Sequence, residues 1–97
     1  MNEPVLSPAE VDASLEEQHI QWERQDDTLS TTVELRDFAA ALAFVNAVGA
    51  AAEAANHHPD IDIRWNKVTL VLTTHSAGGL TVLDLALAAA VDSLRPS

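Results

Sequence analysis

The pattern of apolar residues, with pairs of alternating segments on either side of one long alanine-rich segment, constrains the fold of this chain more than any other feature. Apolar residues recur at nearly every second position over residues 29–36, 61–65 and 68–73. Such alternation is typical of a strand with one buried face. Residues 20–23 alternate in the same way over a shorter length. Four strands are therefore predicted. Short polar turns predict that the first pairs antiparallel with the second, and the third with the fourth.

Three further segments carry the signals of a helix start. In Ser7-Pro8-Ala9-Glu10, a serine cap, a proline at the first helical position and a glutamate three residues after the cap form a capping box, and this helix is expected to end near Glu17. Asp37 is the expected cap of a helix that runs to about Asn56, and Thr81 that of a last helix. The order α-β-β-α-β-β-α predicts an α+β fold with helices packed on one face of a four-stranded antiparallel sheet.

Helical spacing predicts which faces of the two longer helices are apolar. The stripe on the second helix is Phe38, Leu42, Val45, Gly49 and Ala52. The last helix carries one stripe of Leu83, Leu87, Ala90 and Leu94, and an opposite one of Val82, Leu85 and Ala89. The opposite stripe has no partner within so small a chain, so we expect a homo-oligomer with Leu85 at the contact. Trp65 continues the inward row of Ile61 and Ile63 and is expected in the core.

The balance of charge limits the partners of the chain. Its 97 residues carry 15 acidic and 5 basic side chains, a formal net charge of −10, and no cysteine. Direct nucleic-acid and membrane binding are not expected, because a phosphate-rich surface is bound through clustered basic residues. The lack of cysteine excludes disulfides, thiolate metal sites and a cysteine nucleophile. The length predicts a single domain over residues 1–97. With no signal-peptide or membrane-span pattern recognised, a cytoplasmic location is expected.

The side chains suited to chemistry lie near the ends of predicted elements. His57 and His58 follow the long helix, and His75 ends the fourth strand. Antiparallel pairing returns that end of the fourth strand toward the start of the third, so the three imidazoles can converge at one edge of the sheet. Glu53 precedes His57 by four residues, which predicts that both lie on one face of the last helical turn.

These residues form a spaced signature, Glu53-x3-His57-His58-Pro59-x5-Trp65-x9-His75-x8-Asp84, which also contains Asn66-Lys67-Val68 and Thr74-His75-x2-Gly78-Gly79-Leu80-Thr81. The signature closely resembles that of the pterin-4a-carbinolamine dehydratases. The likeness extends to the Gln21-Trp22 strand and to the helix over 38–44, so it covers nearly the whole chain. The fold of that family agrees with the α+β fold predicted from the residue pattern alone.

The resemblance implies a hydro-lyase that converts 4a-hydroxytetrahydrobiopterin into quinonoid dihydrobiopterin and water, a step of tetrahydrobiopterin recycling. It implies His57 and His75 as an acid/base pair, a role suited to histidine because its side chain titrates near neutral pH. Which of the two is the acid is left open. The resemblance implies no metal and no cofactor, and it implies a homodimer or homotetramer built by helix packing and by pairing of sheet edges.

Other roles carried over from the family concern binding and orientation. The residues implied to contact the pterin are His58, Thr73, Thr74 and Ser76, and those implied to orient the imidazoles are Glu53 and Asp84. Many family members carry an acidic residue directly after the third histidine, where this chain has Ser76, so His75 is expected to be tuned differently.

Other interpretations stay open at this point. His57, His58 and His75, with or without Glu53, are an acceptable ligand set for zinc. The chain is alternatively a binding or dimerisation module that kept the fold without the activity. Asp84 follows Thr81 by three residues, so it fits a capping-box acid as well as a site residue.

Overall fold

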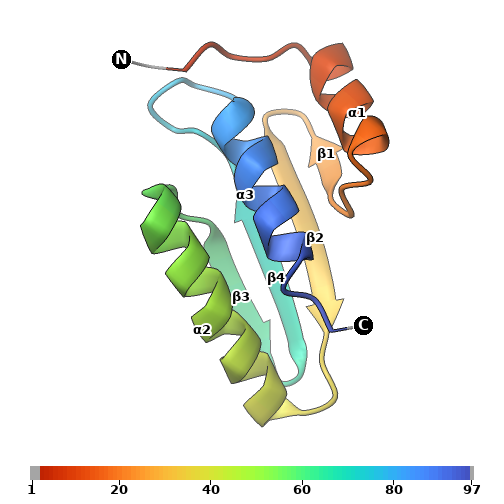
Figure 1. The fold of residues 1–97 in the computed structure, drawn as a ribbon, viewed down its shortest axis with the longest axis vertical. Helices are drawn as coiled ribbons and strands as arrows, with labels where there is room; N and C mark the ends of the chain where they lie inside the picture. Colours follow the sequence, from red (N-terminus) through yellow and green to blue (C-terminus); the bar gives the residue numbers. More distant parts are fainter. Residues whose placement is uncertain (1–2, 97) are drawn as a thin grey trace.

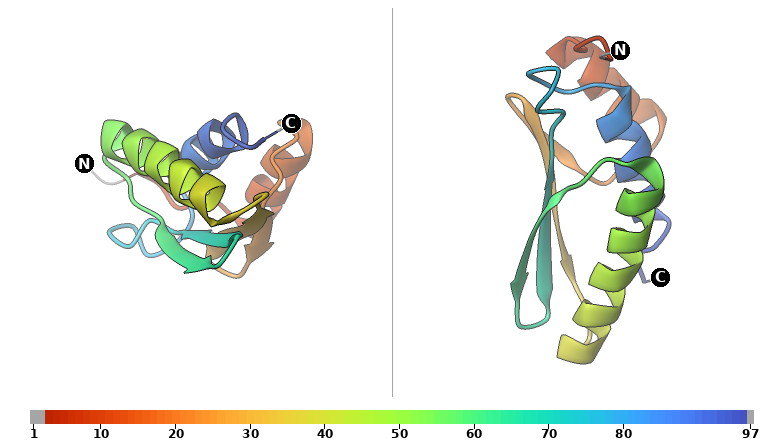
Figure 2. Two further views of the ribbon diagram at one scale, coloured as in Figure 1. Left: turned by 90° about the horizontal axis from the view of Figure 1, so that it is seen from below. Right: turned by 90° about the vertical axis from the view of Figure 1, so that its left-hand side faces the viewer.

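Helices and strands form two layers in the computed structural model, which describes residues 3–96 (Figure 1). The elements are α1 (Pro8–Glu17), β1 (Glu23–Gln25), β2 (Thr28–Glu34), α2 (Phe38–Ala55), β3 (Asp60–Arg64), β4 (Lys67–Leu72) and α3 (Val82–Asp92). All three helices cover the same face of the sheet (Figure 2). The predicted α+β fold and its order, α-β-β-α-β-β-α, are therefore confirmed.

The sheet has four antiparallel strands in the order β1-β2-β4-β3. Both predicted hairpins are present, and α2 carries the chain across the sheet so that β4 pairs with β2 and leaves β3 at one edge. Leu29 pairs with Leu72 and Val33 with Val68, which places apolar side chains of the two central strands on the helix-covered face. On the opposite face the Thr32 and Thr69 hydroxyls share a hydrogen bond of 2.9 Å.

The helices begin at the predicted caps, Ser7, Asp37 and Thr81. At the first cap, the Ser7 N–H donates to the Glu10 carboxylate at 2.8 Å, and this bond lowers the pKa of Glu10 below its ordinary value. Helix α2 ends at Ala55 and is capped by Asn56, which adopts the left-handed conformation with φ of 50°. Asparagine tolerates this conformation better than most residues, so a non-glycine helix end is possible here.

The first strand begins later than predicted. Ile20 and Trp22 are buried at 7% and 5% exposure, but they precede β1 and do not belong to it. The Gln21 N–H donates to Asp92 at the end of α3 at 2.7 Å, and the Trp22 indole N–H donates to the same carboxylate at 3.0 Å. Asp92 also accepts from the Arg95 guanidinium at 2.8 Å. The backbone N–H of Gln21 and the indole of Trp22 are thus bound to the end of α3 instead of forming strand ladder bonds with β2.

The stripe predicted for α2 is correct at Ala52 and wrong at the start of the helix. The residues that this helix buries are Ala41, Phe44, Val48 and Ala52. Phe38 and Leu42 are instead 48% and 40% exposed. The 18 residues of α2 have a mean hydropathy of 1.6, enough by length and composition alone to span a membrane, and four of them pack into the core. Because nearly every position of α2 is apolar, spacing alone does not determine which stripe meets the sheet.

The two stripes predicted for α3 are also wrong. Its buried apolar residues are Leu85, Leu87, Ala88 and Val91. This helix packs against both α1 and α2 as well as lying over the sheet, so its buried face is wide and takes residues from both predicted stripes (Figure 2). Leu85 is 6% exposed and belongs to the core. It is therefore not available for contact with a second copy of the chain.

Trp65 was expected in the core, and this prediction is wrong. Ile61 and Ile63 lie opposite Leu70 and Val68 and face the helices as predicted. Trp65 follows the end of β3, in the turn to β4, where its φ of 53° takes it out of the strand alternation. Its side chain is 70% exposed.

The Asp92 carboxylate is expected to stabilise the fold measurably, because it accepts from the Gln21, Trp22 and Arg95 donors and is only 13% exposed. Asp92→Ala should lower the free energy of unfolding by about 2–4 kcal/mol, measured by chemical denaturation. Asp62→Ala is the control, because Asp62 pairs with Arg64 on the surface and should leave the stability unchanged. Equal losses in the two variants would contradict the role given to Asp92.

Candidate active site

His57 lies just beyond the end of α2, where the left-handed Asn56 redirects the chain. Its own N–H still donates to the Ala52 carbonyl at 3.1 Å, so the backbone is held to the helix. The imidazole Nε2 lies 2.6 Å from Oδ1 of Asp84, at the start of α3. His57 is 9% exposed and Asp84 is fully buried, so this pair joins two helices in the interior.

Asp84 has hydrogen-bond partners on both carboxylate oxygens. Oδ2 accepts from the Thr74 hydroxyl at 2.7 Å and from the Thr81 N–H at 2.9 Å. The Thr81 bond completes a capping box at α3, so Asp84 is both a capping residue and a partner of His57. Its place in the first turn of the helix also suits a carboxylate, because the N-terminal end of a helix carries partial positive charge.

His58 has a different carboxylate partner. Its Nε2 lies 2.5 Å from Oε2 of Glu53, with the two side chains 56% and 78% exposed. Glu53 was expected beside His57, and this is wrong because α2 stops at Ala55. Beyond that residue the helical four-residue relation no longer holds, and His58 is the imidazole that reaches Glu53.

His75 and Ser76 stand in the loop that follows β4, and both are exposed. An isolated bridge between Thr74 and Gly79 closes this loop. Gly78 has a φ of 79°, a left-handed conformation that glycine adopts without strain. The His75 side chain makes no hydrogen bond with the residues of the range 3–96.

A shallow pocket of about 290 Å³ lies between the end of α2 and the loop after β4. Its lining residues are Asn56, His57, His58, Thr73, Thr74, His75, Ser76 and Leu83. The three imidazoles thus line one pocket, together with every residue that the family resemblance implied as a pterin contact. The Thr73 hydroxyl donates to the Asp27 carbonyl at 2.7 Å, and the Thr74 hydroxyl is taken up by Asp84.

Three residues of the site, Asn56, Leu83 and Thr81, were not predicted from the sequence. Asn56 and Leu83 line the pocket, and Thr81 holds Asp84 through its backbone N–H. The capping-box spacing from Thr81 to Asp84 could have indicated that Thr81 binds Asp84. No comparable signal marks Leu83, because its place in the pocket depends on how α3 packs beside the end of α2.

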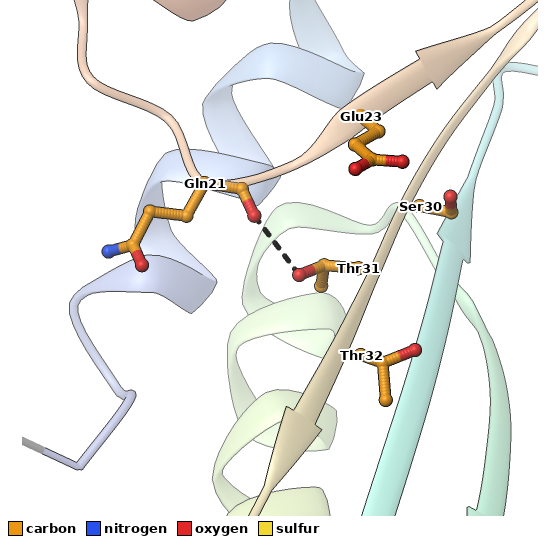
Figure 3. Close-up of a pocket in the computed structure, with 5 residues that line it drawn as sticks. All are labelled: Gln21, Glu23, Ser30, Thr31 and Thr32. Atoms are coloured by element: carbon orange, nitrogen blue, oxygen red, sulfur yellow. Dashed lines mark hydrogen bonds between the residues drawn. The ribbon is translucent and has the colours of Figure 1, made fainter.

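A second hollow, of about 330 Å³, lies along β1 and β2 and is lined by Gln21, Glu23, Ser30, Thr31 and Thr32 (Figure 3). The Thr31 hydroxyl donates to the Gln21 carbonyl at 3.0 Å across it. Hydroxyl and amide groups dominate its lining, and no histidine belongs to it. The signature histidines His57, His58 and His75 therefore line the first pocket and not this hollow.

The arrangement of donors bears on the zinc interpretation. Within residues 3–96 there is no group of three or more His, Cys, Asp or Glu side chains placed to hold a metal ion. His57 and His58 each direct Nε2 to a different carboxylate, one buried and one on the surface. What the pocket offers is a set of imidazoles in unlike surroundings, which suits transfer of protons to and from a bound molecule.

Solved structures define the class to which this fold belongs. The structure named transcriptional coactivator/pterin dehydratase from Brucella melitensis matches with a TM-score of 0.88 and 25% identity, over 95% of this chain and 99% of its own. A structure described as a pterin dehydratase-like protein and RuBisCO assembly factor of the alpha-carboxysome matches with a TM-score of 0.64 and 26% identity. That match covers 79% of this chain and 89% of the other. The architecture is that of the pterin dehydratase-like proteins.

Sequence comparison gives the family. The model of the family described as pterin 4 alpha carbinolamine dehydratase matches residues 4–94. A protein of Chloroflexus aurantiacus is 53% identical over 94% of this chain and 97% of its own length, and one of Nocardia farcinica is 56% identical over 75% and 77%. Both bear the provisional name pterin-4-alpha-carbinolamine dehydratase. The chain belongs to the pterin-4a-carbinolamine dehydratase family.

The two histidine–carboxylate pairs are expected to differ strongly in their effect on stability. Asp84→Ala should lower the free energy of unfolding by about 3–5 kcal/mol, because it removes a buried partner of His57, Thr74 and Thr81 at once. Glu53→Ala breaks an exposed pair with His58 and should leave the stability nearly unchanged. Thermal or chemical unfolding of the two variants measures the difference. Similar losses would show that the buried network is not what holds this end of the fold.

Proposed function

We propose that this protein is a 4a-hydroxytetrahydropterin dehydratase that works by histidine acid/base catalysis. The observation that supports this most directly is the convergence of three imidazoles, from segments 57–58 and 75, on one pocket, with a buried carboxylate behind His57. Membership of the dehydratase family supports the same substrate class. The biological pterin in this proposal is 4a-hydroxytetrahydrobiopterin, in the recycling of tetrahydrobiopterin.

The reaction needs two proton transfers. The bond between carbon 4a and its hydroxyl oxygen breaks as that oxygen takes up a proton, and nitrogen 5 loses its proton, which yields the quinonoid dihydropterin and one water. In this proposal His57 and His75 divide the two transfers, one as acid and the other as base. His57 is held in one orientation by Asp84, and His75 approaches from the loop wall without such a partner. The two imidazoles therefore differ in their surroundings.

The remaining residues of the pocket have binding roles in this proposal. His58, oriented by Glu53 at the exposed rim, contacts the pterin and does not exchange its protons. Ser76 and the backbone next to Thr73 offer polar groups to the heteroatoms of the ring. Ser76 is neutral, so His75 works without the adjacent carboxylate of many relatives.

A second candidate is a role in binding or assembling another protein. The names of two structural relatives support it, because one is called a transcriptional coactivator/pterin dehydratase and the other a RuBisCO assembly factor. An intact set of pocket histidines favours the enzyme. If the folded wild-type protein did not turn over 4a-hydroxytetrahydropterin, the binding role would be favoured.

We also propose that the protein forms a homo-oligomer through the outer face of α2. The exposed residues of this face are Phe38, Ala39, Leu42, Ala43, Asn46, Ala50, Glu53, Ala54 and Ala55. Glu53 is the single charged side chain among them, whereas the whole chain carries a net charge of −10. Two copies of so acidic a protein repel each other least along an uncharged surface, and small alanine side chains let helices approach closely. A second copy of this chain is therefore the occupant that fits this face.

The catalytic part of the proposal predicts unequal effects of three substitutions. His57→Ala and His75→Ala should each lower kcat for 4a-hydroxytetrahydropterin by roughly 100-fold to 10,000-fold, since positioned acid/base groups contribute about that much. His58→Ala should act mainly on KM. Turnover is followed by stopped-flow absorbance, with circular dichroism to verify that each variant is folded. Chelator-treated wild-type protein is a further control and should keep full activity. Wild-type rates in all three variants would refute the assignment.

The assembly part of the proposal is tested by charge insertion. Leu42→Glu should shift the protein toward monomers, because it places like charges opposite each other on α2, where Leu42 is 40% exposed. Val82→Glu is the matched control, because Val82 is 50% exposed on α3, outside the proposed contact. Sedimentation of both variants and of the wild type at micromolar concentration gives the mass. A monomeric wild type would refute the assembly, and an effect of Val82→Glu alone would move the contact to α3.

A further inference from the structure

Thr74 is an unusual residue for the position it occupies. It continues the buried row of β4, in which Val68, Leu70 and Leu72 are all 0% exposed, and it is itself 4% exposed. A valine has the same shape and would fit an apolar row without a hydroxyl that needs partners. The Thr74 hydroxyl has two partners, the Asp84 carboxylate at 2.7 Å and the Thr81 hydroxyl at 2.8 Å.

The directions of these hydrogen bonds follow from the groups involved. An ionised carboxylate only accepts, so Thr74 donates its single hydroxyl proton to Oδ2 of Asp84. Thr74 must then accept from the Thr81 hydroxyl, which in turn accepts from the Leu83 N–H at 3.2 Å. Each hydroxyl in this chain thus has one possible orientation. This series of hydrogen bonds ends at Asp84. The other carboxylate oxygen, Oδ1, can accept one more hydrogen bond, and the atom next to it is His57 Nε2.

We propose that the Thr81–Thr74–Asp84 chain holds neutral His57 in the tautomer that carries its proton on Nε2, so that Nδ1 is the nitrogen that exchanges protons with a ligand in the pocket. Thr74 is then a positioning residue that acts through Asp84 and His57, and its hydroxyl does not contact the pterin. The identity of the ligand rests on the dehydratase function proposed above. The tautomer itself depends only on the hydrogen-bond chain.

The accessibility of Nδ1 supports this assignment. Within residues 3–96, every buried side-chain nitrogen or oxygen has a hydrogen-bond partner, and His57 Nδ1 has none there. Nδ1 is therefore not enclosed by protein, although His57 as a whole is 9% exposed. Because His57 lines the pocket and Nε2 is occupied by Asp84, the pocket is where Nδ1 is reached.

The first test is spectroscopic and needs no substrate. Protein labelled with ¹⁵N in histidine, studied by NMR at a pH where the ring is neutral, should show a pyrrole-type shift for His57 Nε2 and a pyridine-type shift for Nδ1. The reverse pattern, or equal populations of the two tautomers, would overturn the proposal. Asp84→Asn identifies the His57 signals and should abolish the strong preference, since an amide also donates.

The second test separates positioning from substrate contact. Thr74→Val should weaken the tautomer preference and lower kcat roughly 10-fold, as loss of a group that orients a reactive histidine typically does, with KM unchanged. Thr74→Ser restores the hydroxyl and should recover both readouts. Thr69→Val makes the same substitution on the outer face of β4 and should change neither. A rise in KM at constant kcat for Thr74→Val would make Thr74 a substrate contact and overturn the proposal.

The two proposals fail in distinguishable ways. A wild type with the Nε2–H tautomer but no turnover of 4a-hydroxytetrahydropterin would refute the dehydratase and leave the assignment of Nδ1 supported. A wild type with normal turnover and the opposite tautomer would refute the positioning role of the threonine chain alone.

Discussion

The fully buried carboxylate of Asp84 joins three parts of the chain that are distant in sequence. It caps α3 through Thr81, accepts from Thr74 at the end of the β4 row, and bonds His57 after α2. A buried charge is tolerated only when donors compensate for the water it has lost, so these bonds must form together as the fold closes. The position of His57 therefore depends on the correct packing of α2, β4 and α3 at once.

The pocket has one buried wall and one exposed wall. His57 is fixed by its buried partner, whereas His58 and Glu53 form a surface pair and His75 stands in an exposed loop. Thr81 and Asp84 cap α3, and Asp84 also orients the His57 imidazole, so the same residues contribute to stability and to the geometry of the site.

Local patterns predicted a large part of this architecture. The alternation in β2, β3 and β4 and the caps Ser7, Asp37 and Thr81 act over a few residues, so they can be recognised without knowledge of the fold. The convergence of His57, His58 and His75 followed from antiparallel pairing and from the spaced signature. The predicted buried faces of α2 and α3 were wrong because more than one face of each helix is apolar enough to pack against its neighbours. The apolar helix α2 offers no unique buried stripe, and α3 buries a wide face between its neighbours.

The two hairpins, the helix starts, the family and the set of candidate residues could be predicted from the sequence alone, because short-range periodicity, capping and spacing carry that information. The pairing of β2 with β4 and the partners of the individual side chains depend on the folded structure. In the folded structure Asp84 pairs with His57 and Glu53 pairs with His58, because the left-handed Asn56 ends α2 one residue before His57. The fold places Trp65 on the surface, where the turn interrupts the alternation of β3. Such pairings depend on where helix ends and turns fall in space, which spacing along the chain does not specify.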